Sequence, residues 1–248
     1  MKLRAKVFLI VSGAIVVLLS VSFWIIYQKL EREFVAAQYD DALAQIETSS
    51  GIINRDIDSF SIKLADWAQW DDSYDFMESH NQDYIDSNLN DESLQSLGVQ
   101  MALFLDPDGG VVYEKQVESL EGSEESVEFP TKYLQEKAVF REQQKPFAGL
   151  ISIDGNIFLL AVRPIVKSDG SGEPRGTLYF GRQLKQEYFD EIGKISHVQL
   201  DMLPAAVASA IDSEHSDLFM ELAQGVRSSV TMNHEREVHV GQYFPDIF

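Results

Sequence analysis

The sequence LADWAQWDDSYDF, residues 64–76, holds two of the three tryptophans of the chain and four of its aspartates, within about three and a half helical turns. Upstream of this stretch the apolar residues recur at helical spacing, and downstream they gather in short runs separated by turns. The stretch therefore marks the change from a long helix to a sheet, and the residues on its two sides decide the fold.

An uncharged apolar run at residues 7–27 precedes the long helix and is long enough to cross a bilayer. Trp24 and Tyr27 lie near its far end, where amphipathic rings favour the membrane interface. Three basic residues and no acid lie within residues 1–6, which predicts a cytoplasmic tail. We expect a single-pass protein of the cytoplasmic (inner) membrane whose C-terminal part lies outside. A cleaved signal peptide is the alternative, and the length of the run argues against it.

A heptad stripe runs through residues 28–64, which we interpret as a stalk helix, and continues to Trp67. The stripe fits the contact face of a homodimer, and it fits equally a helix packed on its own sheet. The sequence leaves both readings open. Its positions follow alternating steps of four and three, with one polar interruption: Tyr39, Leu43, Ile46, Ser50, Ile53, Ile57, Phe60, Leu64 and Trp67.

Strand patterns begin near Val99 and predict an α+β fold with an antiparallel sheet. Apolar runs flank Gly-containing turns at residues 106–110, 154–156 and 168–172, which are hairpin signals. A short helix is expected within residues 129–145. Further along, we expect a helix at 185–192, a strand at 198–202, a helix at 212–224 and a strand pair at 229–232 and 237–244.

Composition excludes several classes of function. The formal net charge of −20 argues against nucleic acid as a partner, because phosphate binding needs clustered Lys and Arg. The absence of cysteine excludes disulfides and Cys-dependent zinc sites. We find no P-loop, dinucleotide fingerprint or nucleophile elbow, so the sequence predicts neither an enzyme nor a cofactor.

Several motifs together resemble the fourth class of CHASE extracytoplasmic sensor domains. They are DWAQWDDSYDF (66–76), NQDYI (81–85), NL (88–89), GGVVY (109–113), GLI (149–151), RPI (163–165), SDGSG (168–172) and GTLYFGR (176–182). The resemblance covers residues 52–184 and implies a PAS/Cache-like sheet with flanking helices, placed after the transmembrane helix and the long helix. Residues 185–248 would then form a membrane-proximal α/β extension.

The resemblance implies a bacterial or archaeal receptor that binds an unknown small-molecule ligand. Members of the family lie between two transmembrane helices and are followed by output domains such as cyclic-di-GMP cyclases, phosphodiesterases or histidine kinases. This sequence departs from that pattern, since it shows neither a second apolar run nor an output motif. We therefore expect a receptor truncated before its second transmembrane helix. A stand-alone anchored protein that binds a partner is the alternative.

Aromatic residues supply the first candidate binding groups. Trp67, Trp70 and Tyr74 share one face if the helix is continuous, because they are three and four residues apart. They could line a pocket for a flat or cationic ligand, and packing in the core is the alternative. The full candidate ligand-binding set is Asp66, Trp67, Trp70, Asp71, Asp72, Tyr74, Arg163 and Arg182.

Charged residues supply the remaining candidates. Clustered carboxylates such as Asp71 and Asp72 repel one another unless they are solvated, paired or metal-bound. Helix caps and solvated faces account for most of them, so no metal is expected, with a calcium or magnesium site as the alternative. Arg163 and Arg182 lie on strands expected to be adjacent and could bind a carboxylate or phosphate group. Pairing with nearby acids, such as Asp66 or Asp71, is the alternative.

Overall fold

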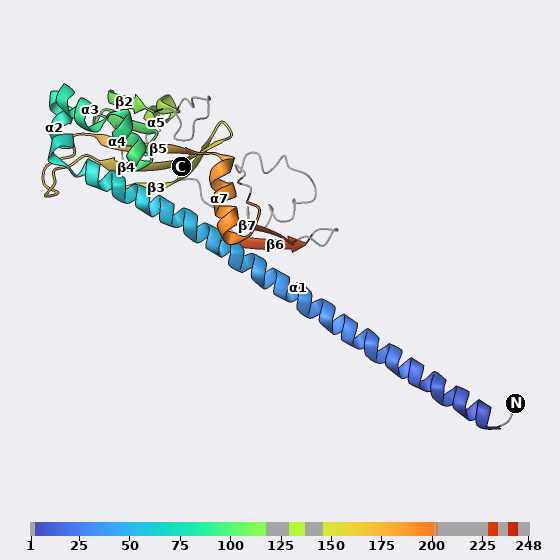
Figure 1. The fold of residues 1–248 in the computed structure, drawn as a ribbon. Coiled ribbons are helices and arrows are strands. Elements are labelled where there is room, and N and C mark those ends of the chain that lie inside the picture. The colour runs from blue at the N-terminus through green and yellow to red at the C-terminus, as the bar shows by residue number, and fades with distance from the viewer. Residues whose placement is uncertain are drawn as a thin grey trace.

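The computed structural model describes residues 3–117, 129–136, 146–200, 202, 228–232 and 238–242 of the 248-residue chain. Helix α1, Leu3–Ala68, has 66 residues and is therefore about 99 Å long. A small α+β domain packs along its C-terminal half, and its N-terminal half projects alone (Figure 1). The apolar part of α1 is long enough to cross a membrane, with a mean hydropathy of 2.6, and is not buried against the domain. This agrees with an N-terminal membrane anchor.

The domain is built on one five-stranded antiparallel sheet, which confirms the predicted fold class. Its spatial order is β2-β1-β5-β4-β3. The predicted turns form between the strands: at Asp154 and Gly155 the backbone adopts φ of 51° and 80°, the left-handed pair that a tight hairpin requires. The strands are β1, Met101–Leu105; β2, Val111–Gln116; β3, Phe147–Ile153; β4, Asn156–Pro164; and β5, Thr177–Leu184.

Alternate residues of each strand face opposite sides of the sheet, and each side has its own core. On β5, Leu178 and Phe180 face α1, whereas Tyr179 faces the other way. The α1 side is the larger core and contains Phe60 and Leu64 of α1. The opposite side contains Phe129 and Leu134, the latter from α5, Thr131–Glu136. Leu178, Phe180, Tyr179 and Leu64 are at most 1% exposed, so both cores are closely packed.

The predicted heptad stripe of α1 packs on the chain's own sheet. Ser50, Ile53, Phe60 and Leu64 are at most 5% exposed, and Trp67 is half-buried. Over this part of the helix the structure confirms the second of the two interpretations, the helix that covers its own domain. Any contact between two copies would therefore have to use another face of α1.

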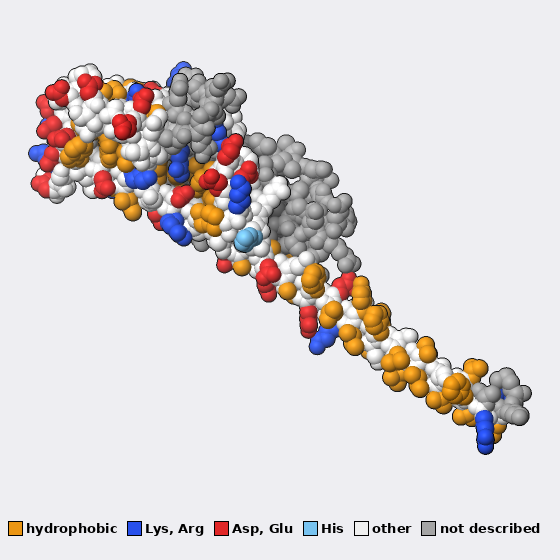
Figure 2. Space-filling model, viewed as in Figure 1, with side chains coloured by type: hydrophobic (Ala, Val, Ile, Leu, Met, Phe, Trp, Pro, Cys, Tyr) orange, Lys and Arg blue, Asp and Glu red, His pale blue; other side chains and the backbone are white. Residues whose placement is uncertain are grey.

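Short helices cover the end of the sheet that lies farthest from the N-terminus of α1 (Figure 1). Asn81 and Asn90 cap two of them, each accepting a hydrogen bond from a backbone N–H of the first turn, at 2.8 and 2.9 Å. These helices are α2, Asp71–Ser79; α3, Gln82–Asn88; and α4, Asp91–Leu97. Exposed acids gather over them, as Figure 2 shows at the end of the molecule opposite the projecting helix.

The chain then returns toward the middle of α1. Helix α7, Gln186–Ser196, and the antiparallel hairpin of β6, Ser228–Met232, and β7, Val238–Gln242, lie against α1 (Figure 1). These elements confirm the helix expected at 185–192 and the final strand pair. Helix α5 confirms the short helix expected within residues 129–145. Residues 137–145 and the helix expected at 212–224 lie outside the described residues.

The strand expected at 198–202 is wrong for the part that the structure describes. After α7 ends at His197, which has a φ of 58°, the Val198 N–H donates to the Gly193 carbonyl at 3.0 Å. The side chain of Gln186 donates to the Leu200 carbonyl at 2.9 Å. The segment folds back along α7 because these bonds satisfy its backbone groups there and not in a sheet.

Candidate functional site

The helix breaks inside the aromatic and acidic stretch, so Trp67 and Trp70 do not share one helix face as predicted. Helix α1 ends at Ala68, and Trp70 is an extended residue that caps α2, with φ −116° and ψ 134°. Asp71 and Asp72 occupy the first turn of α2, where negative charge favours a helix N-terminus. We infer that this new N-terminus, and not a glycine or proline, sets the break.

Asp71 ties this break to the distant loop between β4 and β5. Its backbone N–H donates to Ser168 Oγ at 3.2 Å, and the Ser168 N–H donates to Asp71 Oδ1 at 3.0 Å. One oxygen of this candidate ligand group is therefore used within the chain. Sequence reasoning missed Ser168 because it lies 97 residues from Asp71.

The two tryptophans still meet through their rings. The ring centroid of Trp67 lies 6.2 Å from that of Trp70, in an edge-on contact, and 5.8 Å from that of Phe180 on β5. The ring centroids of Trp70 and Tyr84 are 5.9 Å apart. These rings join α1, α3 and the sheet into one aromatic cluster. Both tryptophans are partly buried and pack against the core, so each leaves only a smaller part of its side chain open to solvent.

Tyr74 is nearly buried and is clamped by the loop between β4 and β5. Its hydroxyl donates to the Glu173 carbonyl at 3.2 Å, and the Arg175 guanidinium lies 4.0 Å from its ring centre, a cation–π contact. Arg175 also pairs with Asp75 at 3.2 Å and with Glu78 at 2.9 Å. Sequence reasoning missed Arg175, since nothing local marks a partner about a hundred residues away.

A buried hydroxyl pair lies beneath this cluster. Ser73 Oγ and Tyr84 Oη are 2.6 Å apart, and the two residues are 0% and 6% exposed. Burial is the main cause that raises the pKa of Tyr84 to about 12, with the Ser73 hydrogen bond acting in the opposite direction and Asp72 adding to the rise. Tyr84 is therefore a neutral structural phenol at physiological pH.

Arg182 lies in a polar contact between three elements. Its guanidinium is 3.9 Å from Asp56 of α1 and lies 5.8 and 5.6 Å from the rings of Phe60 and Tyr188. The Tyr188 hydroxyl of α7 donates to Asp56 at 2.9 Å. Burial first, and then the Asp56 carboxylate, raise the pKa of Tyr188. This cluster joins α1, β5 and α7, and Asp56 and Tyr188 were not found from the sequence.

Arg163 and Arg182 are on adjacent strands, as predicted, but are not brought together. Arg163 pairs with Leu178 in the β4–β5 register, whereas Arg182 pairs with Leu159, four positions along the strand and so about 13 Å away. The Nε atom of Arg163 is buried without a hydrogen-bond partner in the described chain. In the described residues Arg182 lies beside an acid, as the alternative expected, but this acid is Asp56 and not Asp66 or Asp71, and Arg163 has no ion pair with either of those two.

The remaining candidates, Asp66 and Asp72, are exposed. Within the described ranges, His, Asp and Glu side chains form no group of three that could hold a metal ion. Trp67 and Trp70 thus lie together at the turn between α1 and α2, with Asp71 next to Trp70 in the chain. Tyr74 packs instead on the loop between β4 and β5, and Arg163 and Arg182 lie apart from each other on the sheet.

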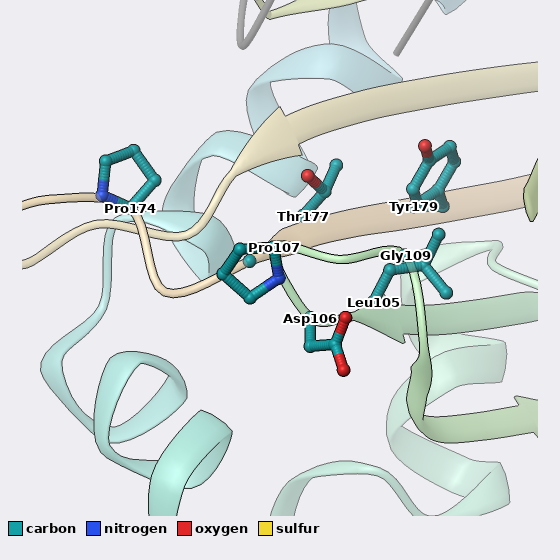
Figure 3. Close-up of a pocket in the computed structure, with 8 residues that line it drawn as sticks. Leu105, Asp106, Pro107, Gly109, Pro174, Thr177 and Tyr179 are labelled. Atoms are coloured by element: carbon teal, nitrogen blue, oxygen red, sulfur yellow. The ribbon is translucent and has the colours of Figure 1, made fainter. Parts of the chain in front are cut away.

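A small hollow lies on the other side of the sheet, at the turn between β1 and β2 (Figure 3). Leu105 and Tyr179 form its apolar floor, and Asp106, Pro107 and Pro174 surround it. Its volume of about 20 Å³ admits roughly one water molecule, far less than the roughly 300–1,000 Å³ of typical ligand pockets. A ligand at this hollow would need the surrounding turns to move.

An antiparallel sheet of this order, packed on a long N-terminal helix that begins as an apolar anchor, is a PAS/Cache-like fold of the kind found in sensor domains. Residues 52–203 match the model of the CHASE4 domain, and the chain belongs to this family. The match begins at the predicted residue 52 and ends at 203, beyond the predicted end at residue 184. It includes the candidate residues before and after the end of α1 at Ala68.

Known relatives agree with this assignment. The methanogenesis regulatory histidine kinase FilI of Methanothrix harundinacea (strain 6Ac) is 26% identical over 190 residues, which cover 75% of this chain and 20% of that protein. The chain therefore spans about one fifth of this curated relative.

One solved structure shows the same fold, and another aligns less closely. The extracellular domain of vpHK1S-Z8, described as a histidine kinase, aligns with a TM-score of 0.52 at 11% identity, over 81% of this chain and 84% of that chain. The ligand-binding domain of the Campylobacter jejuni chemoreceptor Tlp3, solved with L-valine, aligns with a TM-score of 0.44 at 11% identity, over 87% and 89% of the two chains.

Proposed function

We propose that this CHASE4 domain is the ligand-binding module of a bacterial or archaeal membrane signalling receptor, anchored once in the inner membrane with the sensor domain outside. One observation carries the proposal: the helix that forms the apolar anchor is also the helix that closes the sensor core. Phe60 and Leu64 of α1 pack on the same sheet whose other side carries Tyr179. Any ligand that rearranges the sheet therefore acts directly on the membrane helix.

The output of the receptor follows from its relatives as part of the same proposal. FilI is a histidine kinase, and this chain spans only a fifth of it. We propose that the sensor controls a histidine kinase or a cyclic-di-GMP cyclase or phosphodiesterase. In this arrangement, α7 and the β6–β7 hairpin lead back toward the membrane, in keeping with their contacts along α1.

For the ligand, we propose a small molecule that binds at the partly exposed rings of Trp67 and Trp70. An aromatic pair next to Asp71 and Asp72 suits a flat or cationic compound. Tyr74, Asp66, Arg163 and Arg182 would act around this contact by fixing the helices and the sheet. Support comes from the grouping of exposed aromatic surface and carboxylates at one turn of the chain.

Tryptophan fluorescence tests this proposal directly. The chain has three tryptophans, so in a Trp24→Phe background all emission comes from Trp67 and Trp70. The anchored protein in detergent would be screened against cationic and aromatic metabolites, first by thermal shift. A true ligand should raise the thermal midpoint and change the emission, and Trp70→Phe should weaken its binding about tenfold or more. Unchanged emission on binding, or unchanged affinity in Trp70→Phe, would place the ligand elsewhere.

A further inference from the structure

The guanidinium of Arg182 donates no hydrogen bond within the described chain, although it lies where α1, β5 and α7 meet. Its Nε atom is buried without an acceptor, and its Nη2 atom lies 3.9 Å from Asp56 Oδ2, too far for a hydrogen bond. The same Asp56 oxygen accepts the Tyr188 hydroxyl at 2.9 Å instead. The hydrogen-bonding groups of Arg182 are therefore available at this junction.

The surroundings of Arg182 hold the guanidinium and leave one side of it open. The ring centres of Phe60 and Tyr188 lie 5.8 and 5.6 Å from its central carbon, and the side chain is still 24% exposed. The Nη1 atom lies beside Gly98, which caps the C-terminus of α4 with a φ of 70°. A Cβ at Gly98 would be 3.5 Å from Nη1, so bare backbone borders this side of the guanidinium.

Lys63 of α1 brings a second positive charge to the same backbone. Its Nζ atom donates to the carbonyl of Leu97, the residue before Gly98, at 2.8 Å. Lys63 has no ion pair with any residue that the structure describes, so a carbonyl and not a carboxylate holds it. Across the described ranges, Asp56 is the one carboxylate within ion-pair distance of either cation. Two positive charges therefore share one negative charge at this junction.

This local positive excess contrasts with the formal net charge of −20 of the chain. At the other end of the domain, Arg175 contacts two carboxylates, and Lys115 contacts one. Partly buried cations are costly unless opposite charges or hydrogen bonds compensate them. A bound anion would therefore stabilise the junction of α1, β5 and α7.

The chemistry of the two cations suits an oxyanion. A guanidinium donates parallel hydrogen bonds to two oxygens of one carboxylate or phosphate group, and an ammonium adds a further bond as a point charge. Asp56 lies on the Nη2 side of Arg182, where its carboxylate repels anions. This repulsion places the oxyanion on the Nη1 side, between Arg182 and Lys63 and next to Gly98.

We propose that Arg182 and Lys63 form a site for a small oxyanion, a carboxylate or phosphate group, where α1, α4, β5 and α7 meet. Arg182 already fixes α1 to the sheet, and the oxyanion would complete its hydrogen bonds. The site goes beyond the proposed function, because it does not include the two tryptophans. Asp56 lies eleven residues before Trp67, about 16 Å along α1.

Isothermal titration calorimetry of the anchored protein in detergent tests the site, with inorganic phosphate and acetate as the two probes. Chloride keeps the ionic strength constant in every titration, so that general screening cancels. We expect saturable binding of at least one probe, with a Kd of about 1 mM. Binding of phosphate alone or of acetate alone supports the site and identifies the class of oxyanion that it prefers.

Three variants locate the binding. Arg182→Lys keeps the positive charge but loses the forked donors, and should weaken binding about tenfold. Lys63→Gln loses the charge while its amide can still donate to the Leu97 carbonyl, and should weaken binding several-fold. Lys194→Gln is the matched control, because it removes an exposed positive charge of α7 that has no ion pair among the described residues. This control should bind like the unmodified chain.

The proposal is overturned if neither probe shows saturable binding at about twentyfold the expected Kd. Equal affinities in Lys63→Gln and Lys194→Gln would overturn it as well, and this comparison decides the outcome if Arg182→Lys fails to fold. Thermal midpoints in chloride alone check the folding of each variant. Trp70→Phe should bind the oxyanion as tightly as the unmodified chain, so failure of this site and failure of the proposed sensor ligand site can be told apart.

Discussion

The buried pair of Ser73 and Tyr84 shows how one contact at the residue scale sets a property of the whole domain. Burial raises the pKa of Tyr84 from 10.0 to about 12, so the folded state holds the phenol proton more tightly than the unfolded state. The stabilisation is fully present below pH 10 and is lost as the pH rises toward 12. The loss amounts to about 3 kcal/mol over this range.

We therefore expect the free energy of unfolding to fall steeply between pH 10 and pH 12. Urea unfolding followed by circular dichroism at several pH values would measure it. In Tyr84→Phe the fall should be shallower, because only the other tyrosines and the lysines then supply the pH dependence. If both proteins lose stability in parallel, Tyr84 does not carry the effect.

The same pair predicts a pattern among variants. Tyr84→Phe leaves the Ser73 hydroxyl, which is 0% exposed, without its partner and should cost about 1–2 kcal/mol at pH 7. The double variant Ser73→Ala with Tyr84→Phe removes both polar groups and should recover part of that loss. Chemical denaturation of the three variants measures this, and a double variant less stable than Tyr84→Phe would contradict it.

At this scale the sequence identified aromatic and acidic candidates but not their contacts. The rings of Trp67 and Trp70 do meet, but Tyr74 packs against Arg175 and Asp71 is held by Ser168. Those partners come from a loop about a hundred residues later in the chain. No local spacing reveals such a pairing, because it depends on which strands become neighbours.

At the scale of elements, the entry into β5 depends on a close approach at Gly176. A Cβ at this position would collide with the Leu105 carbonyl of β1 and with the end of the Met77 side chain of α2. Gly176→Ala should therefore lower the free energy of unfolding by about 2 kcal/mol or more. Gly51→Ala is the control, since open space and a helical backbone should make it stabilising by about 0.5–1 kcal/mol. Thermal or urea unfolding of both would show opposite signs, and equal effects would contradict the argument.

The contact of Asp56 with Tyr188 links α1 to α7 and can be measured as a coupling. Tyr188→Phe removes a hydrogen bond of 2.9 Å, and Asp56→Asn weakens both this bond and the nearby contact with Arg182. A double-mutant cycle should give a coupling energy of about 1 kcal/mol. This is less than a fully buried hydrogen bond to a carboxylate would give, because the site is partly solvated. Additive effects of the two changes would mean that the bond does not stabilise the junction.

Elements with strong local signals could be predicted from the sequence. Asp-Gly turns placed the hairpin of β3 and β4, and the apolar run placed the membrane helix. The break after Ala68 could not be predicted, because no Gly or Pro marks it and its contacts come from the loop at Ser168. The false strand at 198–202 arose because apolar residues there pack near α7, where an isolated pattern resembles a strand.

At the scale of the whole molecule, the basic tail and the apolar helix predict which side of the membrane the domain occupies. In intact cells, Ile195→Cys should react with a membrane-impermeant maleimide, because α7 belongs to the outside domain. Lys2→Cys should react only after the membrane is permeabilised. Labelling in the opposite order would reverse the orientation and with it the proposed sensor role outside the cell.

The uninterrupted helix α1 has a mechanical consequence. Between Tyr27 and Ala68 it contains no proline and stays helical throughout, and the pair Ser50 and Gly51 is the one place in this stretch where the sequence favours a bend. It behaves as a stiff lever pivoting at the bilayer, with an arm of about 62 Å. A sideways shift of about 5 Å at its tip then tilts the membrane segment by roughly 5°. Movements of α1 near Ala68 therefore change the tilt of the membrane segment. A proline placed at Gly51 would let the helix bend there, and the tilt of the membrane segment would change less.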